Sequence, residues 1–150
     1  MACYRILIFC ITALLWQSNA KAQAILGKTE VGKASFYSSR FNGRKTSFGD
    51  VHKSTDLTAA HRTYPFNTML EITNPDNQEK VIVRVNDRGP YSKSRLVDIS
   101  KEAARLLGIV AKGVAHVSVR VVGMEGMVLL GKDEQVDITT GKIISLKNQD

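Results

Sequence analysis

The stretch Val81-Ile82-Val83-Arg84-Val85-Asn86-Asp87-Arg88-Gly89-Pro90 changes abruptly from apolar to charged residues. Its first half is rich in β-branched side chains, which indicates a strand. The strand leads directly to the Asp87 carboxylate, and the Gly-Pro pair behind it ends the strand. A carboxylate held at a strand end by a stiff turn is suited to binding or catalysis. The two flanking arginines are equally typical of a salt-bridged turn, so this stretch alone leaves both interpretations open.

Short apolar segments on both sides of this stretch predict a mainly β chain. Strands are expected at residues 31–37, 57–60, 68–73, 80–85, 95–99 and 116–122. The Asn-Pro-Asp-Asn turn at 74–77 makes two of them a hairpin that delivers Asp87. A helix is expected from Lys101 to Leu107, with Ser100 as its N-cap and Gly108 as its stop. Many short strands around one helix favour a small closed barrel.

The segments outside these elements carry weaker patterns. Residues 38–50 are rich in Ser, Asn, Gly and Arg and predict a long loop, a kind that is usually functional or disordered. Beyond Gly123 the chain reads either as two further strands, at 127–130 and 136–144, or as a loosely packed tail.

The first residues have the pattern of a secretory signal peptide. A basic start is followed by an apolar run of eleven residues, Ile6 to Trp16, which is too short to span a bilayer. Small residues at Ser18, Ala20, Ala22 and Ala24 mark the cleavage region, and an uncleaved anchor is the alternative. The expected organisation is a signal peptide and cleavage region at 1–24, a linker at 25–30, a barrel domain at 31–122 and a C-terminal extension at 123–150.

The cysteines and the net charge restrict what the exported chain can be. Cys3 and Cys10 both lie in the signal segment, so the mature chain cannot be a disulfide scaffold, a cysteine enzyme or a thiolate metal site. Lipid anchoring at Cys10 is not expected, because Phe9 stands where a lipobox has a small residue. The formal charge falls from +7 to +6 when Arg5 leaves with residues 1–20. A basic exported chain suits an anionic partner such as a cell-wall polymer or a membrane surface, and nucleic acid is a poor fit.

Four side chains are candidates for chemistry, and each has a structural alternative. Asp50 ends the predicted loop and is either functional or an ordinary loop acid. His61 and Asp87 end strands, which can converge on one rim of a barrel, although His61 is also typical of a satisfied core histidine. Asp98 lies between two apolar residues, where a charge needs a partner, and its structural role would be to anchor the backbone near the helix start.

The other histidines and the aromatic residues complete the candidate site. His52 and His116 read as plain surface or strand residues, and three histidines without a mature cysteine predict no metal site and no cofactor. Six of the seven aromatic residues left after signal removal fall between residues 36 and 66. Phe36 and Phe66 are expected in the core, whereas aromatic faces beside carboxylates are typical of sugar-binding sites.

Six short sequence motifs follow one another between Gly32 and Val122. They are Gly-Lys-Ala-Ser-Phe-Tyr at 32–37, Phe-Asn-Gly-Arg-Lys-Thr-Ser at 41–47, Leu-Thr-Ala-Ala-His-Arg-Thr-Tyr-Pro-Phe at 57–66, Val-Arg-Val-Asn-Asp-Arg-Gly-Pro-Tyr at 83–91, Leu-Val-Asp-Ile-Ser at 96–100 and Ala-Ala-Arg-Leu-Leu-Gly at 103–108. This pattern resembles the double-psi β-barrel domain of the rare lipoprotein A (RlpA) family, the septal-ring-type lytic transglycosylases. The resemblance implies a mainly β fold, a six-stranded double-psi β-barrel with one short inserted helix, and a peptidoglycan glycan substrate.

The resemblance also implies a reaction. Members of the family cleave the bond between N-acetylmuramic acid and N-acetylglucosamine without water and leave a 1,6-anhydro end. Because the substrate's own 6-hydroxyl is the nucleophile, one acid/base carboxylate suffices where ordinary glycosidases need two. Matched position by position, the catalytic candidates are Asp87, Asp50, His61 and Asp98. The substrate-binding candidates are Tyr37, Phe41, Arg44, Thr46, Arg84, Asn86, Arg88 and Tyr91.

Roles for the four catalytic candidates follow from the same resemblance. Asp87 is expected to be the acid/base, with Asp50 or Asp98 as a coupled carboxylate that raises one pKa of the pair, and His61 as orienter or shuttle. Asp50 stands where the family carries glutamate, and the missing methylene moves the carboxylate by about 1.5 Å. A displacement of that size can reduce a rate roughly a hundredfold. Residues 123–150 are too short for the family's C-terminal glycan-binding repeat domain, so septal targeting is not implied.

Three functions stay open at this point. The first is an exported endolytic transglycosylase that remodels peptidoglycan in the periplasm or cell envelope of a bacterium. The second is a non-catalytic, expansin-like protein that binds wall polysaccharide through the same groove, and the third is an interaction module that keeps only the barrel. The joint presence of four candidate catalytic side chains favours the first over the third. In each case we expect a monomer without a nucleic-acid partner, and without a membrane span after signal cleavage.

Overall fold

The computed structural model describes residues 25–131, 133–136 and 142–145, and the predicted signal peptide lies outside them. The elements in chain order are β1 (Thr29–Phe36), the 3-10 helix η1 (Ser39–Phe41), β2 (Thr58–Ala60), β3 (Thr68–Thr73), β4 (Lys80–Asp87), β5 (Val97–Ile99), α2 (Lys101–Leu106), β6 (Val114–Met124), β7 (Met127–Val128), β8 (Glu134–Val136) and β9 (Ile143–Ser145). No helix among the described residues is long and apolar enough to cross a membrane.

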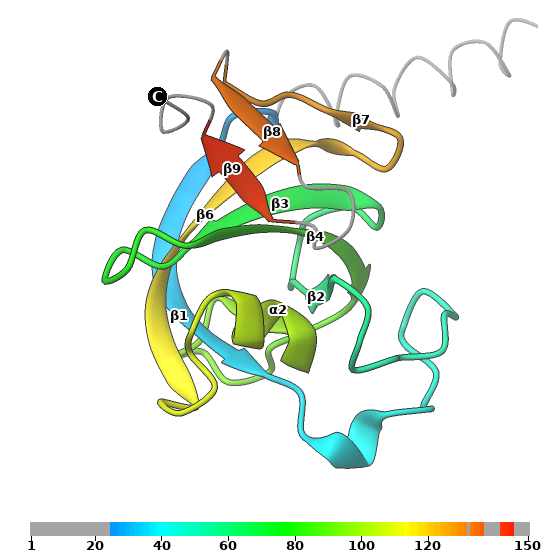
Figure 1. Cartoon of the computed structure of the whole chain (residues 1–150). Coiled ribbons are helices and arrows are strands. Elements are labelled where there is room, and N and C mark those ends of the chain that lie inside the picture. The colour runs from blue at the N-terminus through cyan, green and yellow to red at the C-terminus, as the bar shows by residue number, and fades with distance from the viewer. Residues whose placement is uncertain (1–24, 132, 137–141, 146–150) are drawn as a thin grey trace, which may run out of the picture.

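Six of the strands form a closed barrel (Figure 1). Their hydrogen-bonded order is β1-β5-β2-β4-β3-β6, and β6 pairs back to β1 to close the ring. The β1–β5 and β2–β4 pairs are parallel, and the other pairs are antiparallel. The prediction of a mainly β, six-stranded barrel with one short helix is confirmed.

Alternating burial along the strands builds the core inside this ring. In β6 the valines at 117, 119 and 121 point inward and are almost fully buried, while the residues between them face outward. β4 has no such alternation, because Val81 to Val83 are all buried, as expected for a strand covered on both faces. Phe36 and Phe66, both expected in the core, are partly buried and pack against its edge.

The helix forms as its sequence predicts. The Ser100 hydroxyl accepts a hydrogen bond from the amide of Ala103 (3.3 Å), which satisfies a free N–H of the first turn. Gly108 follows the last turn with φ of +69°, a left-handed conformation that a glycine adopts without strain. The buried face of α2, which includes Ala103 and Leu106, closes one side of the core.

Strand boundaries differ from the predicted ones by a few residues. β1 starts at Thr29, inside the expected linker, and β4 extends two residues beyond the apolar run to Asp87 itself. β6 extends beyond its expected range at both ends, because pairing with β1 and β3 continues past its valines. These shifts arise because backbone pairing, rather than side-chain polarity, decides where a strand ends.

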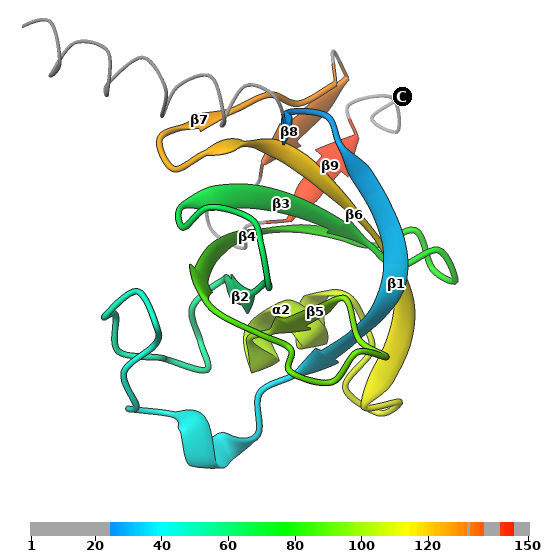
Figure 2. The same cartoon turned by 180° about the vertical axis from the view of Figure 1, so that it is seen from behind.

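Beyond Gly123 the described residues form three short strands, β7, β8 and β9, in place of the two strands expected at 127–130 and 136–144. β7 pairs with the end of β6, and β8 and β9 form a two-stranded sheet. The ion pair Lys80–Glu134 (2.7 Å) and an isolated bridge between Val81 and Lys142 attach this sheet to β4. Both views place β7, β8 and β9 at one end of the barrel, and the loop with η1 at the other (Figures 1 and 2).

Candidate functional site

Asp87 is held in place by four hydrogen bonds where β4 ends. Its Oδ1 accepts from the amide of Ser47 (2.8 Å), the Ser47 hydroxyl (2.7 Å) and the amide of Arg88 (2.8 Å). Its Oδ2 accepts from the Tyr37 hydroxyl (3.0 Å). Three chain segments thus converge on one carboxylate group, and they fix its direction.

These hydrogen bonds decide the charge of Asp87. Burial raises the pKa of its carboxyl, but the bonds from Ser47, Arg88 and Tyr37 together outweigh burial, and the net pKa lies below its usual value. Asp87 is therefore ionised at neutral pH. The raised pKa expected for one carboxyl of a coupled pair is not found at Asp87, because hydrogen-bond donors surround this group. Burial raises the pKa of Tyr37 strongly, and the Asp87 charge adds to the effect, so the hydroxyl keeps its proton.

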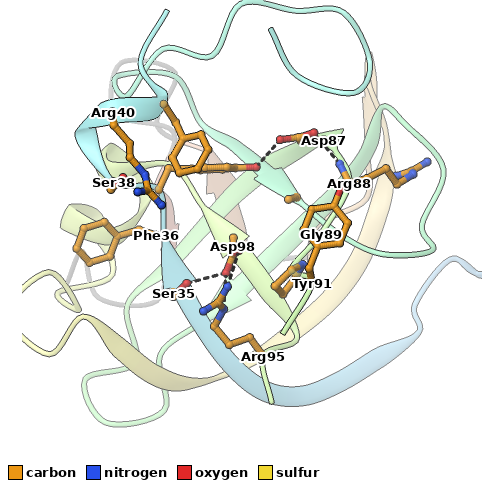
Figure 3. Close-up of a pocket in the computed structure, with 14 residues that line it drawn as sticks. Ser35, Phe36, Ser38, Arg40, Asp87, Arg88, Gly89, Tyr91, Arg95 and Asp98 are labelled. Carbon is orange, nitrogen blue, oxygen red and sulfur yellow. Dashed lines mark hydrogen bonds and ion pairs between the residues drawn. The ribbon is translucent and has the colours of Figure 1, made fainter. Parts of the chain in front are cut away.

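Neither flanking arginine forms an ion pair with Asp87, which rules out the salt-bridged turn. Arg84 pairs with Asp50 (2.6 Å between Nη2 and Oδ2) and also donates to the Asn67 side chain (3.0 Å). The Arg88 guanidinium donates to the carbonyl oxygens of His61 (3.2 Å) and Tyr64 (3.0 Å). Figure 3 shows its side chain directed away from the Asp87 carboxylate. The charge of Asp87 is thus stabilised by neutral donors.

The predicted loop that ends at Asp50 is ordered, and its tip is docked on the barrel rim. It folds back on itself through a bridge between Lys45 and Val51 and a 2.8 Å bond from the Thr46 amide to the Asp50 carbonyl. The turn at its tip brings Ser47 to Asp87 and Asp50 to Arg84. Asp50 and Asp87 therefore lie on one rim, although each has separate partners.

Asp50 is ionised and satisfied by its neighbours. Its Oδ2 accepts from the Asn86 side chain (3.1 Å) as well as from Arg84. The bond from Asn86 and the bond from Arg84 both lower the pKa of the Asp50 carboxyl. This arrangement gives Asp50 an attachment to the barrel, and it does not produce a protonated acid at neutral pH.

A cleft of about 340 Å³ opens beside Asp87. Its lining residues come from β1, η1, β2, β4, β5 and the adjoining loops: Ser35, Phe36, Tyr37, Ser38, Arg40, Phe41, Ala60, Asp87, Arg88, Gly89, Pro90, Tyr91, Arg95 and Asp98. Asp87 and Asp98 thus face the same cleft (Figure 3). Arg62 supports the far wall, because its guanidinium donates to the carbonyl oxygens of Pro90 (3.2 Å) and Arg95 (2.7 Å).

Asp98 is bound by side chains and does not hold the helix. Its Oδ1 accepts from the Ser35 hydroxyl (2.6 Å) and lies 3.0 Å from Nε of Arg95, while Oδ2 accepts from Nη2 of Arg95 (3.3 Å). The helix start is capped by Ser100 instead. The expectation that Asp98 anchors the backbone at the helix start is therefore wrong, since its strand register turns the carboxylate toward the cleft.

His61 lies behind the rim and is 3% exposed, and the neighbouring Tyr64 is buried to the same extent. Its Nδ1 accepts from the amide of Tyr64 (3.1 Å), and the two rings stack at 4.0 Å. Burial lowers the pKa of His61 to about 4, so the imidazole is neutral. Its contact with Asp87 runs through the backbone, where the His61 amide donates to the Asp87 carbonyl (3.2 Å).

The predicted substrate-binding residues divide into two groups. Tyr37, Phe41, Arg88 and Tyr91 line the cleft. The others lie beside it or below its rim: Arg44 next to Phe41, Thr46 in the docked loop, and Arg84 and Asn86 at Asp50. Thr46 is 9% exposed and its hydroxyl is buried without a partner in the described residues, so it is not an open contact site.

Besides Ser35 and Arg62, the sequence-based list omitted four residues that shape the site. They are Ser47, which donates twice to Asp87; Arg95, which holds Asp98; Arg40, on the cleft wall; and His52, which packs on Tyr37 at 4.5 Å. His52 is 5% exposed, so the prediction that it lies on the surface is wrong, whereas His116 is exposed on β6 as expected. Ser47 had a signal, because it closes one of the quoted motifs, and Ser35 and Arg62 also lie inside quoted motifs.

The described residues contain no group of three histidine, cysteine or acidic side chains that could hold a metal ion.

Residues 29–119 match the model of a protein family described as lytic transglycolase. The chain belongs to this family. This match and the relatives described next confirm the relation to RlpA proteins that the motifs predicted. They also confirm the double-psi β-barrel.

Relatives from several bacteria share this domain. The chain is 48% identical to the endolytic peptidoglycan transglycosylase RlpA of Pasteurella multocida over 99 residues, which cover 66% of this chain and 34% of the relative. It is 46% identical to the probable endolytic peptidoglycan transglycosylase RlpA of Treponema pallidum over 114 residues, covering 75% of this chain and 35% of the relative. The chain thus spans about a third of the length of these relatives.

Solved structures with the same fold are more distant. An apo expansin of Clavibacter michiganensis superposes with a TM-score of 0.53 at 24% identity, covering 63% of this chain and 50% of the expansin. A Streptomyces papain inhibitor superposes with a TM-score of 0.52 at 19% identity, covering 63% of this chain and 94% of the inhibitor. At these identities the likeness supports the barrel fold alone.

Proposed function

We propose that this protein is an endolytic peptidoglycan lytic transglycosylase, which cleaves the β-1,4 bond between N-acetylmuramic acid and N-acetylglucosamine within glycan strands and leaves a 1,6-anhydro end. The observation that carries the proposal is the Asp87 carboxylate, oriented by Ser47 and Tyr37 at the wall of an open cleft in a domain of this family. The relatives' name supports the same substrate.

The proposed reaction moves one proton and exchanges two bonds. The bond from C1 of the muramyl residue to the leaving O4 breaks, and a bond from C1 to O6 of the same residue forms. The 6-hydroxyl loses its proton to a base, and O4 gains a proton, so no water is consumed. Asp87 carries both transfers, first as base and then as acid. Its ionised form in the free protein suits the first transfer, and a bound glycan that excludes water would raise its pKa for the second.

The other candidates support this carboxylate. Asp98, fixed by Ser35 and Arg95 in the same cleft, supplies a negative charge for the oxocarbenium-like transition state. His61 acts as an orienter, because its backbone holds Asp87 while its neutral ring packs on Tyr64. Asp50 positions the loop that carries Ser47, through its pair with Arg84. A short Asp at this position is compatible with such an attachment role.

The proposal includes a compartment and an assembly state. A wall-cleaving enzyme acts in the cell envelope, and the export pattern of residues 1–24 would deliver it to the periplasmic side. The basic net charge suits an anionic wall polymer. We expect a monomer, and gel filtration with light scattering would check this.

Mass spectrometry of purified glycan strands after incubation tests the activity. We expect products with 1,6-anhydro ends, and we expect Asp87→Asn to reduce their formation at least about a hundredfold. Asp76→Asn, in an exposed ion pair with Lys112, is the matched control and should act like the native protein. Anhydro products at the native rate from Asp87→Asn would overturn the assignment of Asp87.

A second outcome separates the two remaining classes of function. Reducing ends would identify a hydrolase, and retained strand binding without any product would identify an expansin-like binding protein. The observation that favours the expansin-like alternative is that the Asp50 carboxylate is already engaged by Arg84 and Asn86.

A further inference from the structure

One arginine in the cleft has neither an acidic partner nor a hydrogen bond from its guanidinium among the described residues. Arg95 is paired with Asp98, and Arg88 donates to two carbonyl oxygens and lies 3.7 Å from the centre of the Phe66 ring. Arg40 also lines the cleft, but within the described part of the chain its guanidinium contacts only the Phe41 ring, at 5.1 Å from the centroid. Its charge is therefore unneutralised.

The position of Arg40 is set by η1, which follows β1 directly. Figure 3 shows Arg40 on one wall of the cleft and Tyr91 on the opposite wall, with Asp98 between them. Arg44 adds a second guanidinium at the same place, 5.9 Å from the Phe41 centroid, and it too has no acidic partner among the described residues. The Phe41 ring thus carries two uncompensated positive charges at the edge of the cleft.

This arrangement fits a ligand that presents a ring and a carboxylate together. A sugar ring packs on an aromatic face, and a guanidinium binds a carboxylate through parallel hydrogen bonds. Neither acid of the cleft is available to pair with the Arg40 guanidinium, since Asp87 and Asp98 are already engaged by other donors.

We propose that Arg40, assisted by Arg44, forms an anion subsite that binds a carboxylate of the muramyl residue and so selects acidic glycan over neutral glycan. The inference rests on the proposed function and names the group of the substrate that this side of the cleft recognises. That carboxylate is either the lactyl group of a peptide-free strand or an acidic residue of an attached stem peptide.

Binding measured in the Asp87→Asn background, which leaves the glycan uncleaved, tests the subsite. The ligands are peptide-free muramyl oligosaccharides, the same oligosaccharides with their carboxylates reduced to alcohols, strands with stem peptides, and N-acetylglucosamine oligomers of equal length. We expect Arg40→Gln to weaken binding of the carboxylate-bearing ligands about tenfold and to leave the two neutral ligands unchanged. Arg44→Gln should give a smaller loss with the same selectivity. Arg105→Gln, which removes the same charge from the exposed pair with Glu102, is the control and should change no affinity.

Each outcome decides a different point. A larger effect of Arg40→Gln on peptide-free strands would assign the lactyl carboxylate, and a larger effect on strands with stem peptides would assign the peptide. Equal loss for acidic and neutral ligands, or no loss for any, would overturn the anion subsite while leaving the proposed activity intact if native protein still forms anhydro ends. Absence of glycan binding together with absence of product would overturn both.

Discussion

At the residue scale, the central feature is a single carboxylate surrounded by four neutral donor groups, which come from three residues. Ser47, Tyr37 and the Arg88 amide hold Asp87 ionised without any ion pair. An ionised base is lost when the pH falls through its pKa, so activity should decline on the acidic side of the profile. The position of that decline reports how strongly the donors act.

Tyr37→Phe removes one of these donors. We expect the pKa of Asp87 to rise, so the acidic limb of kcat/KM against pH moves to higher pH, and we expect activity at neutral pH to fall about tenfold. Tyr64→Phe is the matched control, because it loses the same hydroxyl at a bond to Glu30 and leaves the bonds of Asp87 intact. An acidic limb that moves equally in both variants, or in neither, would contradict this account.

His61 makes a separate contribution, to stability. Its pKa is lowered from 6.5 to about 4, so between these pH values the unfolded chain binds a proton that the folded chain does not. The free energy of unfolding should therefore fall as the pH decreases from 6.5 to about 4. Urea denaturation across this range checks the sign: His61→Gln should flatten the dependence, and exposed His116→Gln should keep it. An unchanged slope in His61→Gln would show that other groups cause it.

At the scale of elements, the docked loop tip connects β4 to the site. Gly49 has φ of +104° in the turn between Ser47 and Asp50, and a Cβ there would meet nothing within 4 Å. Gly49→Ala thus introduces backbone strain without a clash, at a cost of about 1 kcal/mol. Because the strained turn carries Ser47, we expect glycan cleavage to fall at least about tenfold as well.

Gly126→Ala supplies the matched control for the loop. Gly126 has φ of +88° in the turn between β6 and β7, and it too has open space around it. It should lose similar stability in chemical denaturation and keep more activity than Gly49→Ala, because its turn is linked to the docked loop only indirectly, through the Glu125–Arg84 ion pair (3.6 Å). Equal losses of activity in the two variants would mean that stability alone explains the effect.

At the scale of the whole molecule, the C-terminal strands and the cleft occupy opposite ends of the barrel (Figures 1 and 2). Glu134 ties β8 to the barrel through Lys80 (2.7 Å) and Arg120 (3.7 Å). We expect Glu134→Gln to reduce the free energy of unfolding by less than about 1 kcal/mol, since the pair is partly exposed, and to leave glycan cleavage unchanged. Loss of activity without loss of stability would contradict the separation of the two ends.

The pH dependence of the free energy of unfolding at acidic pH tests the same Lys80–Glu134 ion pair. The bond from Lys80 and the bond from the Gly131 amide lower the pKa of Glu134. Its contribution is present above the ordinary glutamate pKa and is lost as the pH falls through the lowered one. The native protein and Glu134→Gln should therefore converge in stability at acidic pH.

Local pattern was enough to predict the elements that position the site. β-branched runs, the 74–77 turn and the Ser100 cap predicted the hairpin that ends at Asp87 and the helix beside it, because these signals depend on residues close in sequence. The resemblance of the motifs added the six-stranded barrel. Strand ends and partners of charged groups were harder to predict, as Asp98 and His52 show, because register and burial depend on distant segments.

The barrel, the family and the candidates His61, Asp87 and Asp98 could be inferred from the amino-acid sequence, since each rests on a local motif, and Asp50 could be inferred from its place at the end of the predicted loop. The charge and the partners of these side chains depend on the folded arrangement. Ser47 lies forty residues from Asp87 along the chain, yet it donates two of the bonds that keep Asp87 ionised. The same folding turned Arg84 toward Asp50 and Arg88 toward carbonyl oxygens, and it left Arg40 in the cleft without an acidic partner among the described residues. A pKa depends on the neighbours that the fold brings within hydrogen-bonding distance, and those neighbours are not adjacent in sequence.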